Sequence, residues 1–122
     1  MEPEIFATIL GLVESDGDPD APLGDGGRAA GRFQIHPDWE YEWSDRLKIR
    51  PKLNERRDSF YSRLVQAFFQ FPFHLKLLPV EVAMTFHKGH IVRQTSPLPA
   101  DWDAGYAARW VEKAKIVTPS VA

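Results

Sequence analysis

Apolar residues recur at intervals of three and four along much of the chain, which is the spacing of one face of an α-helix. The first such stripe begins just after Pro3, a residue favoured in the first turn of a helix. It stops at Asp16-Gly17, where the glycine is expected to terminate the helix. The pattern therefore predicts an N-terminal amphipathic helix, whose apolar face is formed by Ile5, Phe6, Ile9, Leu12 and Val13.

Two further helices are predicted in the middle of the chain. A short helix begins at Pro37 and carries two tryptophans four residues apart, Trp39 and Trp43. A long helix follows over about 55–71, with Asn54 as its N-terminal cap and Pro72 as the residue that ends it. The apolar spacing within this long segment predicts a buried face formed by Phe60, Leu64, Ala67, Phe68 and Phe71.

The C-terminal third predicts two more helices. One begins at Pro79 and ends at Gly89, and the last begins at Asp101, which is expected to cap it. Three aromatic residues of the last helix share one face: Trp102, Tyr106 and Trp110. We expect at least two of the chain's four tryptophans to be buried in the core.

Between the first and second helices the sequence changes character. Residues 16–32 are rich in Gly, Asp, Pro and Ala, which predicts an irregular loop or a small hairpin. Phe33-Gln34-Ile35 is interpreted as a short strand. The predicted fold is thus mainly α, of the α+β type, with a small irregular or β region around residues 16–36.

The composition fits a single domain over residues 1–122, because 43% of the 122 residues are apolar. The absence of cysteine excludes disulfides and thiolate metal sites, and no apolar run approaches the length of a membrane span. A net charge of −2 weighs against nucleic acid as a partner. We expect a monomer without a cofactor. The start Met-Glu-Pro-Glu lacks the basic residues of a secretory signal, so the location stays open.

Charge is unevenly spread along the chain. Residues 1–45 are rich in Asp and Glu, whereas 46–63 are rich in Lys and Arg and contain Phe60 and Tyr61. The basic segment is either a site for an anionic polymer or the solvated face of a helix, and we favour the second interpretation.

Glu14 is the first candidate for chemistry. It lies in the last turn of the N-terminal helix, at the edge of the apolar stripe. Burial and the negative end of the helix dipole both favour a neutral carboxyl group. A carboxyl that stays protonated near neutral pH can act as a general acid. The alternative is an exposed glutamate at a helix end.

Two further polar residues follow in the glycine-rich region. Asp25 lies in Gly24-Asp25-Gly26-Gly27, whose glycines allow the backbone to approach a ligand closely. Two acids in contrasting surroundings suit glycoside cleavage, although an Asp-Gly turn is also common in loops. Gln34 lies within an apolar run and needs a hydrogen-bond partner if it is buried, which is either a carbohydrate group or nearby backbone.

The order of these motifs resembles that of a known family. Glu14-Ser15, an Asp-Pro-x-Ala segment, Gly24-Asp25-Gly26-Gly27 and a Gly-x-x-Gln-Ile segment follow one another closely. This string resembles the lysozyme-like superfamily, specifically soluble lytic transglycosylases and phage lysozyme-like proteins. The resemblance covers 5–39 closely; beyond it, only the helix order, the 83–90 segment and the 106–110 segment are similar.

The resemblance implies a lysozyme-like fold with a cleft, and cleavage of the β-1,4 bond between N-acetylmuramic acid and N-acetylglucosamine in peptidoglycan glycan strands. Glu14 takes the general-acid position, and Asp25 matches a second acid that a hydrolase uses and a lytic transglycosylase does not need. The same resemblance gives the substrate-binding positions as Ser15, Gly31, Gln34, His87 and Tyr106. A phage particle, a holin or a secretion apparatus would deliver such a protein to the cell wall.

The sequence departs from the family pattern at two places. Arg32 stands where many relatives have proline or a small apolar residue, so we expect a more polar cleft wall. His87-Lys88-Gly89-His90 replaces an Asn-Gly or Gly-Gly turn. These histidines lack a third ligand at metal-site spacing, and we expect no metal. The changes leave a second hypothesis open: a catalytically inactive lysozyme-fold module that binds cell wall, a protein or an anionic polymer. An all-α nucleic-acid-binding or regulatory domain is a remote third.

Overall fold

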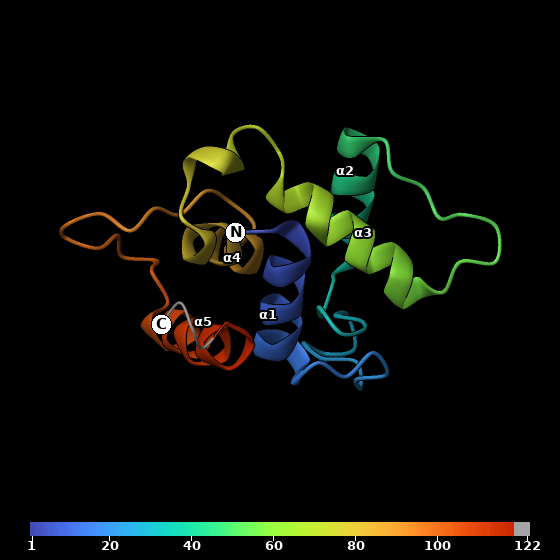
Figure 1. Cartoon of the computed structure of the whole chain (residues 1–122), viewed down its shortest axis with the longest axis horizontal. Helices are drawn as coiled ribbons and strands as arrows, with labels where there is room; N and C mark the ends of the chain where they lie inside the picture. The colour runs from blue at the N-terminus through green and yellow to red at the C-terminus, as the bar shows by residue number, and fades with distance from the viewer. Residues whose placement is uncertain (119–122) are drawn as a thin grey trace.

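The computed structural model describes residues 1–118 and shows a mainly helical chain (Figure 1). The predicted mainly α class is confirmed. Regular strands are absent from the described residues, and no helix among them has the length and apolar character needed to cross a membrane. The helices are α1 (Pro3–Ser15), α2 (Pro37–Leu47), α3 (Arg57–Phe69), the 3₁₀ helix η1 (His74–Lys76), α4 (Pro79–Lys88) and α5 (Ala104–Val117).

Helix α1 lies at the centre of the fold and packs against α3 and α5 (Figure 1). The centre of its apolar face is fully buried, with Phe6, Ile9 and Leu10 at 0% exposure, whereas Ile5 and Leu12 at its edges are half-buried. The ring of Phe6 stacks on Phe69 of α3 at 4.3 Å and lies 5.3 Å from Trp110 of α5. Aromatic burial of this kind is a major source of stability, so the position of α1 is fixed by the core itself.

The end of α1 falls where the sequence predicts it. Asp16 and Gly17 both adopt left-handed backbone, with φ of 56° and 82°, and the Gly17 N–H donates to the Gly11 carbonyl at 3.0 Å. The aspartate therefore shares the terminating role that the sequence assigned to the glycine alone. As a result Glu14 lies in the last turn, at the rim of the core.

The region between α1 and α2 is a loop held by isolated β-bridges, Gly24 with Ala29 and Ala30 with Ile35. The short strand predicted over 33–35 is wrong. Gln34 has a φ of 50°, in the left-handed region, which breaks the extended backbone that a strand requires. Phe33 and Ile35 are buried at 1% exposure, so their apolar character reflects core packing and not sheet pairing.

Helix α3 is shorter than the predicted 55–71 segment, and Asn54 does not cap it. Asn54 has a φ of 62° and belongs to a turn. Glu55 is held in that turn because its carboxylate accepts hydrogen bonds from the Lys52 N–H at 3.0 Å and from Arg63 at 2.7 and 2.8 Å. The helix then begins two residues later. It ends at Phe69, ahead of Pro72.

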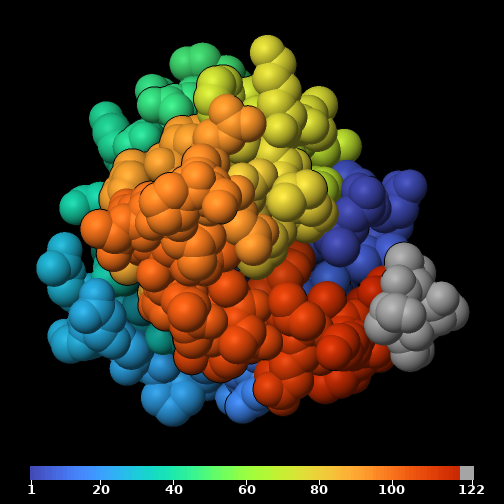
Figure 2. Space-filling view, turned by 90° about the vertical axis from the view of Figure 1, so that its left-hand side faces the viewer, coloured from blue at the N-terminus to red at the C-terminus, as the bar shows by residue number. Residues whose placement is uncertain are grey.

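Helices α2 and α4 begin at the predicted prolines, and Gly89 ends α4 with a φ of 81°. Helix α5 is capped by Asp103, and the predicted cap at Asp101 is wrong. The Asp103 Oδ1 atom accepts a hydrogen bond from the Tyr106 N–H at 3.0 Å. Asp101 instead pairs with His90. Figure 2 shows the orange segment between α4 and α5 at the surface of the molecule, next to the red α5.

Two of the four tryptophans are buried as predicted. Trp43 of α2 and Trp110 of α5 are 8% and 4% exposed. Trp39 is half-buried against the core, and its ring meets the Phe86 ring edge-on at 4.9 Å. Trp102 lies just before α5 and is also half-buried, so it does not share the helical face that the sequence predicted for it.

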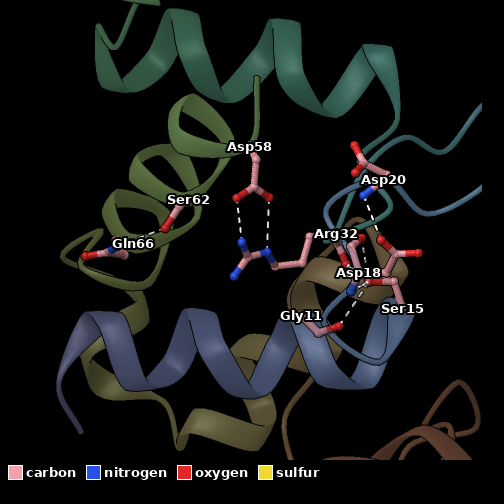
Figure 3. Close-up of polar contacts among 8 residues, drawn as sticks. All are labelled: Gly11, Ser15, Asp18, Asp20, Arg32, Asp58, Ser62 and Gln66. Carbon is pink, nitrogen blue, oxygen red and sulfur yellow. Dashed lines mark hydrogen bonds and ion pairs between the residues drawn. The ribbon is translucent and has the colours of Figure 1, made fainter. Parts of the chain in front are cut away.

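Arg32 links the loop between α1 and α2 to helices α1 and α3 (Figure 3). Its guanidinium donates two hydrogen bonds to the carboxylate of Asp58 in α3, at 3.0 and 2.5 Å, and its carbonyl accepts one from the Ser15 hydroxyl at 2.6 Å. A Cβ atom on Gly11 would lie 2.8 Å from the Arg32 side chain, so the glycine makes room for this contact. The expectation that Arg32 lines a cleft wall is therefore wrong, because the side chain points toward α3.

Removal of this contact is expected to destabilise the fold. Arg32→Met keeps the aliphatic stem and leaves Asp58 without its bidentate partner, which should cost about 1–2 kcal/mol because the pair is half-buried. Urea unfolding followed by circular dichroism measures the change. Lys48→Met is the control, since the Lys48–Asp45 pair is exposed and 3.8 Å apart. Equal effects of the two substitutions would contradict a special role for Arg32.

Candidate active site

A cavity of about 410 Å³ opens beside the last turn of α1. Four of the predicted site residues line it, although they come from different parts of the fold: Glu14, Asp25, Gln34 and His87. The loop between α1 and α2 forms one wall, and the end of α4 forms another. The complete lining is Glu14, Asp25, Ala29, Gln34, His36, Trp39, Phe86 and His87.

Glu14 has the properties that a general acid requires. Burial raises its pKa from 4.5 to about 7, while a hydrogen bond from Tyr106 and the positive charge of Arg109 pull the pKa back down only in part. The Tyr106 hydroxyl donates to Oε2 of Glu14 at 2.6 Å. A substantial fraction of this carboxyl group is therefore protonated at neutral pH.

Tyr106 lies behind the carboxyl group and not in the open cavity. Only 1% of the tyrosine is exposed, and burial together with the charge of Glu14 raises its pKa well above the ordinary value. The phenol therefore remains a hydrogen-bond donor over the whole working range of pH. The family resemblance implies that Tyr106 contacts the substrate. In the structure its hydroxyl contacts Glu14, which lies 92 positions earlier in the sequence.

Asp25 has surroundings that contrast with those of Glu14. It lies at the tip of the loop with a φ of 49°, and its side chain is 71% exposed. Nε2 of His36 lies 3.2 Å from Oδ2 of Asp25. His36 was not predicted as a site residue, and its only signal in the sequence is its position directly before Pro37, the first residue of α2.

Gln34 lines the cavity, but local backbone holds its amide group. Its Nε2 donates to the Gly31 carbonyl at 3.0 Å and to the Pro22 carbonyl at 3.4 Å. The amide oxygen packs so closely on Gly24 that a Cβ atom there would lie 2.1 Å from it. The sequence left two kinds of partner open for Gln34, a carbohydrate group or nearby backbone. These contacts support nearby backbone.

Ser15 and Gly31 belong to the frame behind the cavity. The Ser15 hydroxyl is occupied by the Arg32 carbonyl, and Gly31, at a φ of 76°, packs close to the ring of Tyr61. A larger side chain at Gly31 would be strained in this backbone conformation. Both residues therefore hold the loop that forms the wall, and their contacts lie within the protein.

The histidines near the end of α4 each pair with an aspartate. Nε2 of His87 lies 3.0 Å from Asp103, and His90 pairs with Asp101 in the same way. Only His87 lines the main cavity. Within residues 1–118, no three metal-ligating side chains gather closely enough to hold an ion.

The cavity continues toward α2. A second hollow of about 330 Å³ shares its lining with the first at His36, Trp39, Phe86 and His87. It adds side chains of both charges, namely Arg28, Asp38, Glu42 and Lys88. The two hollows therefore adjoin and together form an open groove, with the half-buried Trp39 shared between them.

The basic segment is largely engaged within the protein. Arg63 pairs with Glu55, and Arg50 lies 3.7 Å from Asp45. Arg46 lies over the ring of Trp43 at 4.5 Å. These contacts weigh against a polymer site, but the segment is not the face of one helix, because 48–56 form a loop between α2 and α3.

Comparison of the chain with protein-family models, with curated proteins and with solved structures finds no match. The functional argument therefore rests on the geometry of the groove and on the chemistry of the side chains that line it.

Proposed function

We propose that this protein cleaves the β-1,4 glycosidic bond between N-acetylmuramic acid and N-acetylglucosamine in peptidoglycan. It would do so as a muramidase or a lytic transglycosylase, with Glu14 as the general acid. The observation that carries the proposal is the half-buried Glu14 carboxyl in the wall of an open cavity, held by the Tyr106 hydroxyl and with its pKa raised to about 7. A protonated carboxyl beside a groove is the central requirement of glycoside cleavage.

The lysozyme-like fold is part of the same proposal. Three placements support it: the acid ends the first helix, the glycine-rich loop faces it across the cavity, and a tyrosine of the last helix lies behind it. The family resemblance of residues 5–39 covers the first two of these placements and supplies the substrate.

In the proposed reaction the proton passes from Glu14 to the glycosidic oxygen as the C–O bond breaks. The Tyr106 donor and the Arg109 charge both lower the pKa of Glu14, which means that they stabilise the carboxylate more than the neutral acid. The same groups therefore stabilise the charge that develops on Glu14 during bond cleavage.

The second step distinguishes two enzymes. In a hydrolase, Asp25 stabilises the sugar cation or activates a water molecule, and its high exposure suits an ionised carboxylate. In a lytic transglycosylase, Glu14 takes the proton back from the sugar's own hydroxyl group, and an anhydro sugar forms without water. Asp25 is then dispensable.

Mass spectrometry of purified peptidoglycan after incubation with the protein tests the proposal. New reducing ends indicate a hydrolase, and anhydro ends indicate a transglycosylase. Asp25→Asn should reduce product formation only in the first case. Intact strands from several cell-wall types would overturn the proposal, and retention of uncut strands by the protein would favour the inactive binding module.

A further inference from the structure

The ring of His87 lies flat on the ring of Tyr106. The two ring centres are 4.0 Å apart and the planes differ by only 7°. His87 lies in the last turn of α4 and Tyr106 in the first turn of α5, so the stack joins two helices beside Glu14. One face of the phenol is thus covered by an imidazole that also lines the cavity.

Asp103 holds both members of this stack. Its Oδ2 atom lies 3.0 Å from Nε2 of His87, and its Oδ1 atom accepts the Tyr106 N–H at 3.0 Å. The aspartate therefore fixes the backbone of the tyrosine and the plane of the histidine at once. The hydroxyl end of the same tyrosine is the group that donates to Glu14 at 2.6 Å.

A second histidine–aspartate pair lies nearby and lacks this arrangement. His90 pairs with Asp101 in the segment between α4 and α5, and these two side chains are 59% and 43% exposed. The His90 pair provides an internal comparison for a pair without the stack.

We infer that His87 is a positioning residue: held by Asp103, its ring fixes Tyr106 in the place from which the tyrosine hydroxyl binds Glu14. The catalytic consequence of this inference rests on the proposed function, whereas its geometric part does not. It differs from the role that the family resemblance implies for His87, which is a direct contact with substrate.

The charged groups around the stack come from each neighbouring element. The guanidinium carbon of Arg109 in α5 lies 5.6 Å from the Tyr106 ring centre. The positive charge of Lys88 in α4 lowers the pKa of Asp103. Across the cavity are the paired Asp25 and His36. A His87 substitution removes none of these groups, and a comparison with and without the Tyr106 hydroxyl separates the effect that passes through Tyr106 from a direct effect on Glu14.

A double-mutant cycle tests the inference, with the pKa of Glu14 followed by carboxyl carbon NMR. Tyr106→Phe removes the hydroxyl and should raise the pKa of Glu14 above about 7, because that hydrogen bond lowers it. His87→Ala should shift the pKa in the same direction by a smaller amount. In the Tyr106→Phe background, His87→Ala should change nothing further.

Turnover supplies the second readout. His87→Ala should lower kcat about tenfold with KM nearly unchanged, and by less than about twofold when Tyr106 is already Phe. His87→Phe keeps a flat ring against the tyrosine and should recover most of the loss. His90→Ala is the matched control and should leave both the pKa of Glu14 and kcat unchanged.

Additive effects of His87→Ala and Tyr106→Phe would overturn the inference, as would a His87→Ala variant that raises KM alone, which indicates a substrate contact. A folded His87→Ala variant with an unchanged pKa of Glu14 would overturn it as well. If the wild-type protein cleaves no peptidoglycan, the proposed function fails while the NMR cycle still tests the positioning role.

Discussion

Glu14→Gln is expected to abolish peptidoglycan cleavage, lowering turnover by about 10²–10⁴-fold, which is the usual contribution of a general acid. The amide has nearly the shape of the carboxyl group and can still accept the Tyr106 hydrogen bond, so binding of substrate should change little. What it lacks is an acidic proton for the leaving oxygen. Release of soluble fragments from a labelled peptidoglycan suspension measures the loss.

Glu4→Gln is the matched control for this substitution, because Glu4 is an exposed residue in the first turn of the same helix. It should retain full activity. A Glu14→Gln variant with more than about a tenth of wild-type turnover would show that another group supplies the proton.

The pH profile follows from the same carboxyl group. The general acid must be protonated, so wild-type activity should fall as pH rises through the Glu14 pKa of about 7. Tyr106→Phe should move this basic limb to higher pH.

The second large effect concerns stability. Glu14→Gln is expected to stabilise the fold by about 3 kcal/mol more at pH 8 than at pH 4, because the wild-type carboxyl must ionise in a buried position. The folded pKa of about 7 lies above the ordinary value of 4.5. Below pH 4.5 the group is protonated in both the folded and unfolded states, so it does not lower the free energy of unfolding there.

Between pH 4.5 and 7 the unfolded chain releases this proton while the folded protein keeps it, so the wild-type free energy of unfolding falls as pH rises. Above pH 7 the full cost is present. The neutral glutamine avoids it. Urea unfolding of both proteins at pH 4, 6 and 8 measures the difference, and Glu4→Gln should show no such trend. A constant difference across this range would mean that Glu14 titrates normally.

These two predictions separate structure from function. The stability experiment needs no substrate, so it tests the burial of Glu14 even if cleavage is never observed. A variant that is more stable and inactive would show that the site keeps an unfavourable carboxyl group for its chemistry, as functional sites commonly do.

The helices were predictable because their apolar spacing is local information. The start of α1 at Pro3 and the end of α4 at Gly89 follow from single residues with strong conformational preferences. The caps were less predictable, since Asp101 and Asp103 are chemically equivalent. Both aspartates pair with a histidine, and only the structure shows that α5 begins at Ala104, so that Asp103 directly before it accepts the Tyr106 N–H.

The candidate site was predictable in part for the same reason. The position of Glu14 at a helix end beside an apolar stripe is visible in the sequence, and so is the loop that carries Asp25. The hydrogen bond from Tyr106 joins residues 92 positions apart, and no spacing reveals it. The strand expected at Gln34 failed because an alternating pattern of buried residues also arises in a tightly turned loop.

The attachment of the loop to α1 has a practical consequence for anyone who wishes to alter substrate range. The hydroxyl of Ser15, the neighbour of Glu14, donates a hydrogen bond to the Arg32 carbonyl, and the Arg32 guanidinium donates to Asp58. The loop wall of the groove is therefore held from behind, by residues that do not line either hollow. Libraries directed at the visible lining would vary the surface of the groove, whereas libraries at Ser15, Arg32 and Asp58 would vary its size.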